Sequence, residues 1–301
     1  MRISNNLVVQ QQLAGLTQNM TALQQASQRV TTGKQLLEAS DDPLAATQVM
    51  ASSTSLAALD QYKSNVQAAS SRVSLEDNIL QQIGDLVTRA KELAIQEGTG
   101  TASDATHAVA SAEMQQLFGQ VVALGNTKIG NEYLFGGDQS LTAPFAVSGA
   151  GANTDYSTTN PQGTRTVAID TGQSIAMSND GTQLLITTGV LDSMKQLAQA
   201  MAAGSPTYGQ AGITTAASAL DTAFDKVQTL VGDVGARGKQ LDVTQQNLDA
   251  YKTNLTTFKS NLQDVDMDTA VTELTNRQMA YQAAMLATSK VMGLTLTDYL
   301  K

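Results

Sequence analysis

The chain has 301 residues and a net charge of -9, and its hydrophobic content of 42% is sufficient to form buried cores. Binding to nucleic acid or to an anionic membrane surface needs clustered basic side chains, whereas the 18 Lys and Arg residues are scattered, so the composition argues against both partners. The absence of Cys excludes a disulfide framework, a thiolate nucleophile and a Cys-based metal site.

The first element predicted in chain order is a helix that ends near Gly33. Its apolar residues recur in alternating steps of four and three, which is typical of a coiled-coil seam. Asp42 and Pro43 supply an N-cap and a favourable first helical residue, so a second helix is expected to begin there. The seam of the first helix consists of Val9, Leu13, Leu16, Met20, Leu23 and, after a single Ser, Val30.

The second helix is predicted to continue to the Gly-containing loop at 98–100, and a third helix to end near Gly130. Between about 139 and 189 the composition changes, because Gly, Ser, Thr and Asn clusters separate short runs of β-favouring residues. These runs lie at 164–169, 173–177 and 183–188. We therefore expect a small β-rich insert.

Helical periodicity returns after the insert and continues to about residue 231. The closely spaced glycines at 232–238 indicate a helix interruption rather than a phosphate-binding loop, since the required Gly and Ser or Thr are missing. A clean seam resumes at Leu248, and a last helix carries Leu274, Tyr281, Met285 and Met292 at helical spacing. Because the chain begins and ends in seams, the N- and C-terminal halves are expected to pack alongside each other.

No catalytic or metal-binding pattern is found in the sequence. The acidic run of Asp264, Asp266 and Asp268 lacks the Gly and the final carboxylate of a calcium loop, so its carboxylates are assigned to a helix N-terminus. The only histidine, His107, has no triad-like neighbours and is predicted to be solvated. A secreted enzyme built on the insert is disfavoured, because the only charged side chains of residues 139–189 are Asp155, Asp170, Asp180 and Arg165.

Short motifs at both ends of the chain resemble the flagellin superfamily of bacterial flagellar axial proteins, and within it the hook-associated protein 3 family. The filament flagellins more often carry Asp-Asp-Ala-Ala-Gly at the position of Asp41-Asp42-Pro43-Leu44-Ala45, which favours the junction proteins. The motifs cover roughly the first 138 and the last 70 residues, in the order and spacing of the family. They include Met1-Arg-Ile-Ser4, Thr32-Gly-Lys34, Arg89-Ala-Lys-Glu-Leu93, Tyr133-Leu-Phe-Gly-Gly137, Val234-Gly-Ala-Arg237, Ala270-Val-Thr-Glu-Leu274 and Asp298-Tyr-Leu300.

The resemblance implies a non-enzymatic structural subunit that forms a ring between hook-associated protein 1 and the flagellin filament, outside the cell. It also implies export as an unfolded chain by the flagellar type III apparatus, with a chaperone on the C-terminal segment, which agrees with the absence of a recognisable cleavable signal. Two alternatives remain: a filament flagellin, and a coiled-coil signalling hairpin, which would lack a β insert at its midpoint. No cofactor is expected, and the insert matches no known pattern.

The combined interpretation is a mainly α protein, a flagellin-like helical rod with terminal coiled-coil segments and a small β-rich insert. The expected layers are 1–42 with 262–301, disordered until assembly, then 43–138 with 190–261 as the helical rod, and 139–189 as the insert. The residues expected to form the assembly interface with other copies are Val9, Leu13, Leu16, Met20, Leu23, Val30, Leu274, Tyr281, Met285, Met292, Leu296, Tyr299 and Leu300.

Overall fold

A computed structural model describes residues 2–99 and 102–299 of the protein. The chain divides into two compact units, of which the first comprises Met1–Ala58 and Ala250–Lys301 and the second Leu59–Asp249. The first unit is therefore built from the two ends of the chain. Among the described residues, no helix combines the length and the apolar character that crossing a membrane would require.

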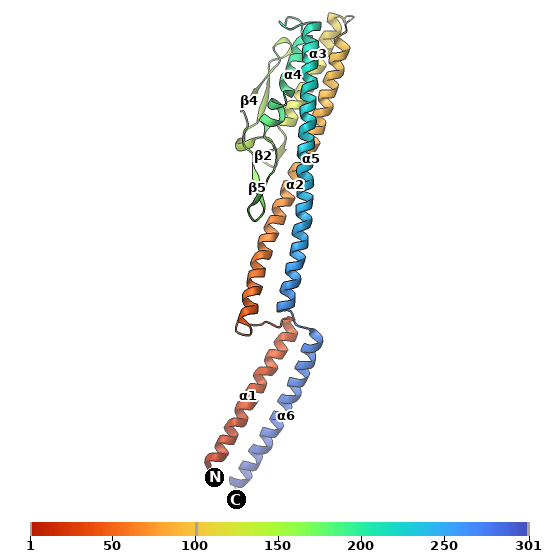
Figure 1. Cartoon of the computed structure of the whole chain (residues 1–301). Helices are drawn as coiled ribbons and strands as arrows, with labels where there is room; N and C mark the ends of the chain where they lie inside the picture. The colour runs from red at the N-terminus through yellow and green to blue at the C-terminus, as the bar shows by residue number, and fades with distance from the viewer. Residues whose placement is uncertain (1, 100–101, 300–301) are drawn as a thin grey trace. The chain divides into compact units, whose positions relative to one another are not determined.

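Helices dominate the structure, which confirms the predicted mainly α fold (Figure 1). Two of them are unusually long, with 55 residues in α2 and 54 in α5, and each contributes to both units. The helices are α1 (Arg2–Thr32), α2 (Pro43–Glu97), α3 (Asp104–Gly125), α4 (Val190–Met201), α5 (Gln210–Gln263) and α6 (Met267–Tyr299).

The starts of two helices follow from local sequence. The side chain of Asp42 accepts hydrogen bonds from the backbone N–H groups of Leu44 and Ala45, both at 3.0 Å, which confirms the predicted N-cap of α2. At α3, Ser103 and Thr106 form a reciprocal capping box. Each cap satisfies backbone donors that a helix N-terminus otherwise leaves unpaired.

The core of the second unit lies between α3, α4 and the parts of α2 and α5 that belong to this unit (Figure 1). Salt bridges at the surface of this core join α2 to α3 and to α5. Arg89 pairs with Glu113 on α3 at 2.8 Å, and Lys91 pairs with Asp221 on α5 at 2.7 Å. The fully buried apolar residues include Ile79, Leu80, Ile83, Val87, Met114, Phe118, Val121, Leu191, Met194, Leu197, Ile213, Leu220 and Val227.

Three antiparallel hairpins form the β-rich part of the second unit. In the second hairpin Phe145 pairs with Thr158, and in the third Thr166 pairs with Ala176, with a register shift between Ala168 and Asp170. Gly125, at the end of α3, allows this part to approach closely, because an added Cβ would lie 2.6 Å from a methyl carbon of Leu185. The strands are β1 (Lys128–Ile129), β2 (Glu132–Tyr133), β3 (Phe145–Ser148), β4 (Asp155–Thr158), β5 (Thr166–Asp170) and β6 (Gln173–Ala176).

The prediction of a β run at 183–188 is wrong. Residues Thr182–Thr187 form a short π-helix instead, and its consecutive residues Leu184 and Leu185 are both fully buried. A half-buried strand would direct one of them to solvent. Asp180 fixes the first turn, since its side chain accepts a hydrogen bond from the N–H of Gln183 at 2.8 Å.

Two further predictions from the sequence are also wrong. His107 is only 7% exposed, because the capping box of α3 places it one turn into the helix, where its ring contacts Tyr208 edge-on. The glycines at 232–238 do not interrupt α5, which is continuous from Gln210 to Gln263. A Cβ on Gly238 would lie 3.7 Å from Val73 on α2, so this glycine lies at the contact between the two helices.

Candidate assembly interface

The first unit contains a pair of helices, α1 and α6, that pack along each other in opposite directions (Figure 1). Small buried side chains allow this contact: Ala26 on α1 is 3% exposed and Ala270 on α6 is 4% exposed. Near the same end, Arg29 Nη1 lies 3.5 Å from Glu273 Oε2. These contacts confirm, for the two terminal helices, the prediction that the N- and C-terminal halves pack alongside each other.

Backbone hydrogen bonds join the two connections that lead into this helix pair. Gly33 ends α1 with a positive φ of 69°, and its carbonyl accepts from the N–H of Val265 at 3.0 Å. The N–H of Gln35 donates to the carbonyl of Gln263 at 2.7 Å. We call residues 33–35 and 263–265 the crossing, because both chain segments leave the helix pair through these hydrogen-bonded residues.

Asp266 occupies the start of α6, and its side chain accepts a hydrogen bond from the N–H of Asp268 at 3.0 Å. This geometry supports the assignment of the acidic run to a helix N-terminus. In residues 2–99 and 102–299 no group of three or more acidic or His side chains is arranged to hold a metal ion.

The contact between α1 and α6 leaves large apolar side chains exposed on both helices. On α1, Leu13 is 44% and Met20 is 47% exposed. On α6, Met285 is 49% exposed. Contiguous apolar surface is typical of sites where proteins associate, so these side chains make the helix pair the candidate interface. Among the side chains that the structure describes, the other exposed large apolar residues of this helix pair are Leu7, Met267, Val271, Met279 and Leu286.

The predicted interface residues differ in their environments. Leu13, Met20 and Met285 are exposed, and five others are half-buried, so they contribute to the contact within the chain as well. The half-buried ones are Leu16, Leu23, Val30, Leu274 and Tyr281. Leu300 lies outside the described residues, as do the side chains of Val9, Met292, Leu296 and Tyr299.

Sequence reasoning missed Met279 and Leu286, which are 56% and 67% exposed. The two residues are seven positions apart and therefore share one face of α6. A single seam through Leu274, Tyr281 and Met285 cannot include them. The seven-residue spacing of Met279 and Leu286 could have revealed them. It gives α6 a second apolar row, which is more apolar surface than one partner helix covers.

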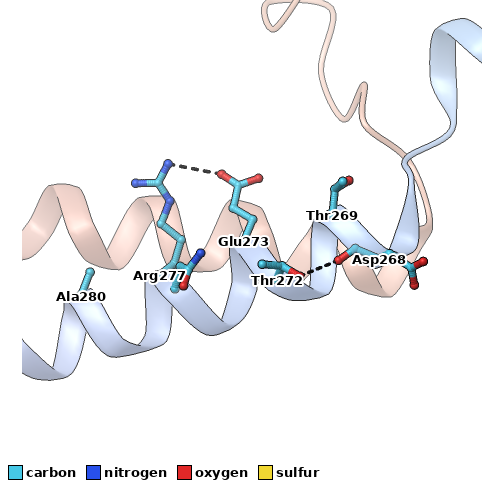
Figure 2. Close-up of a pocket in the computed structure, with 7 residues that line it drawn as sticks. Asp268, Thr269, Thr272, Glu273, Arg277 and Ala280 are labelled. Atoms are coloured by element: carbon cyan, nitrogen blue, oxygen red, sulfur yellow. Dashed lines mark hydrogen bonds and ion pairs between the residues drawn. The ribbon is translucent and has the colours of Figure 1, made fainter.

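A groove of about 810 Å³, lined mostly by residues with polar side chains, runs along α6 (Figure 2). Figure 2 shows Glu273 and Arg277 paired across one turn, with Arg277 Nη2 at 3.3 Å from Glu273 Oε1. Glu273 thus pairs with Arg277 and, across to α1, with Arg29. The groove is lined by Asp268, Thr269, Thr272, Glu273, Asn276, Arg277 and Ala280.

Two further properties characterise the surface of the helix pair. Residues 3–28 of α1 contain no charged side chain. Many exposed threonines also donate their hydroxyl to a carbonyl of their own helix, for example Thr17 to Leu13 at 2.9 Å and Thr272 to Asp268 at 2.8 Å. The surface therefore combines exposed apolar side chains with neutral polar ones.

Two family comparisons match the N- and C-terminal helical regions of the chain. Residues 3–140 match the family described as the bacterial flagellin N-terminal helical region, and residues 217–300 match the bacterial flagellin C-terminal helical region. Together the two matches cover more than half of the chain. The first includes α1, α2 and α3, and the second includes most of α5 and α6.

Individual proteins give similar results. The chain is 26% identical to flagellar hook-associated protein 3 of Salmonella typhimurium strain LT2 over 98% of each chain. It is 28% identical to flagellar hook-associated protein 3 of Escherichia coli strain K12, again over 98% of each chain. Its fold is similar to the structure of a flagellar hook-associated protein from Vibrio parahaemolyticus, with a TM-score of 0.65, 18% identity, and coverage of 74% of this chain and 100% of that one.

Proposed function

The chain belongs to the bacterial flagellin family, and on this premise we propose that it is a structural subunit of the flagellum that forms the junction ring between hook-associated protein 1 and the flagellin filament. The similarity to hook-associated protein 3 over 98% of the chain is the observation that carries this proposal. This similarity extends through both helical ends and the region between them.

The exposed apolar side chains of α1 and α6 support a role in assembly. Leu13, Met20 and Met285 are each between 44% and 49% exposed, and a neighbouring copy would bury them. A ring requires contacts between two different surfaces of adjacent copies, related by a rotation that closes. We propose that the exposed apolar side chains of α1 and α6 form one of these two surfaces.

The proposed subunit acts through its contacts with other chains and carries out no catalytic reaction. Its partners are further copies of itself, hook-associated protein 1 and flagellin, and before assembly an export chaperone and the type III export apparatus. The layer formed by 1–42 and 262–301 is proposed to become ordered on assembly. The layer of 43–138 with 190–261 would support it, and 139–189 would lie in the β-rich insert.

The position of the subunit along the flagellum tests this proposal directly. An epitope placed at Leu141, which is 75% exposed in the β-rich part, can be located on intact flagella by immunogold electron microscopy. The expected result is label only at the boundary between hook and filament. Label along the whole filament would identify a filament flagellin and overturn the junction role.

A further inference from the structure

A buried carboxylate lies where α2, α5 and the segment 177–181 meet in the second unit. Glu76 on α2 has no exposed surface. Its Oε1 accepts a hydrogen bond from the N–H of Asn179 at 3.0 Å, and its Oε2 lies 3.5 Å from Arg237 Nη1 on α5. Arg237 also donates from Nη2 to Asn179 Oδ1 at 3.0 Å. These three residues therefore connect two long helices and one loop.

The segment 177–181, which we call the strap, links β6 to the π-helix and holds the β-rich part in place. The hydroxyl of Ser178 donates to the carbonyl of Leu134 at 3.2 Å, and the N–H of Gly181 donates to the carbonyl of Phe135 at 2.9 Å. Ser178, Asn179 and Asp180 are all buried. The strap is thus attached to the β-rich part by neutral hydrogen bonds, and to the helices through Glu76 and Arg237.

The charge of Glu76 is incompletely compensated. Neither Glu76 Oε2 nor Arg237 Nη1 has a hydrogen-bond partner, although both atoms are buried. Burial raises the pKa of Glu76 to about 7, and the hydrogen bond from Asn179 and the charge of Arg237 only partly oppose this effect. The other charged residues near the site are Asp77 on α2, which raises the pKa further, Asp180 in the strap, and Lys226 and Asp233 on α5, which line one cavity with Asn179 and Arg237.

We propose that Glu76 acts as a proton-operated latch, which holds the strap against α2 and α5 more firmly when its carboxyl group is protonated than when it is ionised. When the strap opens, water reaches Glu76 and the pKa returns towards its ordinary value of 4.5. The closed state therefore binds the proton more tightly than the open state. The resulting stabilisation is fully present at acidic pH and is lost as the pH rises through about 7.

Nothing in this inference depends on the assembly role, since all of its residues lie in the second unit. It assigns to the chain a local opening that responds to pH near neutrality. A subunit with such a latch would hold its β-rich part more loosely in a slightly alkaline medium than in a slightly acidic one.

Amide hydrogen exchange on the full chain tests the latch. Opening constants of the strap amides, corrected for the intrinsic pH dependence of exchange, are compared at about pH 5.5 and about pH 8. We expect opening to be at least about tenfold more frequent at the higher pH. In Glu76→Gln, which keeps an oxygen acceptor for Asn179 but cannot ionise, the strap should open equally at both pH values. Asp77→Asn is the matched control and should retain the pH dependence.

Two results would overturn the proposal: equal opening of the wild-type strap at both pH values, or a pH dependence in Glu76→Gln that equals that of the wild type. If Glu76→Gln does not fold, Arg237→Gln provides a second test. Loss of the Arg237 cation should move the midpoint of the transition to higher pH, because the charge of Arg237 lowers the pKa of Glu76. An unchanged midpoint would contradict the latch.

Discussion

The backbone N–H of Val265 donates a hydrogen bond to the carbonyl of Gly33 at 3.0 Å, and this bond brings together residues that are 232 positions apart in the chain. It holds the end of α1 beside the start of α6. Because the bond is made by main-chain atoms, it depends on the backbone conformation of Gly33, whose φ is 69°. That dependence leads to the first prediction.

Gly33→Ala should weaken the crossing by about 1 kcal/mol, because a residue with a Cβ is strained at positive φ. No atom lies within 4 Å of the added Cβ, so strain rather than a steric clash is the cause. The amides of Gln35 and Val265 should exchange faster. Gly232→Ala in the middle of α5 is the matched control: it also has open space, and its helical conformation predicts stabilisation by roughly 0.5–1 kcal/mol. Equal effects of the two substitutions would contradict the argument.

Leu13→Asp should block assembly and leave the second unit folded. The side chain is 44% exposed in the single chain, so folding alone tolerates a carboxylate there, whereas a neighbouring copy would bury it without a cation nearby. Association should weaken at least about tenfold, equivalent to about 1.4 kcal/mol per interface. Sedimentation measures assembly, and circular dichroism measures the helices. Leu141→Asp, in the β-rich part, should assemble normally, and equal loss in both variants would count against the proposed interface.

Assembly through α1 should respond weakly to salt. Residues 3–28 carry no charged side chain, so this part of α1 makes no charge–charge interactions that salt could screen. We expect the extent of association to change less than about threefold between about 0.05 M and 1 M NaCl. A steep loss of association at high salt, followed by light scattering, would show instead that ion pairs dominate the contact.

Glu132 should stabilise the second unit at neutral pH and not in acid. Arg165 and Arg72 both pair with its carboxylate, at 2.6 and 3.2 Å, and together they lower the pKa of Glu132. Because the folded-state pKa lies below the usual 4.5, the stabilisation is present above that value and is lost as the pH falls through the lowered pKa. The urea midpoint of Glu132→Gln should therefore lie below that of the wild type at pH 7. The difference should shrink as the pH falls below 4.5, and a constant difference would show that packing, not charge, is responsible.

Deletion of residues 288–301 should abolish filament attachment and leave the thermal unfolding of the second unit unchanged. The segment includes the C-terminal part of α6 and lies in the first unit only. Burial of three apolar side chains of average size against neighbours stabilises an interface by on the order of 5 kcal/mol. Secretion of the truncated protein without filament formation would assign the segment to assembly, and retention in the cell would assign it to export. Normal swimming would contradict both roles.

The helical part of the fold follows from local sequence. Asp42 and Pro43 predict the start of α2, and the three-and-four spacing around Leu13 and Leu16 predicts a seam, because these signals act within one or two turns. Leu184 and Leu185 show the limit of such reasoning. A short apolar run is compatible with a strand or with a helical turn. Here both residues are buried, and the segment forms a π-helix.

The buried charge of Glu76 depends on contacts that are distant in sequence. Its partners lie 103 and 161 positions away, at Asn179 and Arg237, and no local pattern connects them. A signal was nevertheless present, since Glu76 follows Val73 by three residues and precedes Leu80 by four, on the apolar stripe of α2. A carboxylate in such a stripe indicates a buried polar partner. His107 gives no comparable signal, because no local pattern connects it to Tyr208, whose ring it contacts.

The threonines of α1 and α6 affect the free-energy cost of desolvating these helices. Thr17, Thr21 and Thr31 on α1, like Thr272 and Thr275 on α6, each donate to the carbonyl four residues earlier. Their donors are thus satisfied before any neighbour arrives, and dehydration of the methyl-bearing side leaves no donor stranded. The free-energy cost of removing water from this surface is therefore small, although many of its residues are polar. A helix that packs against it need not supply acceptors for these hydroxyl groups.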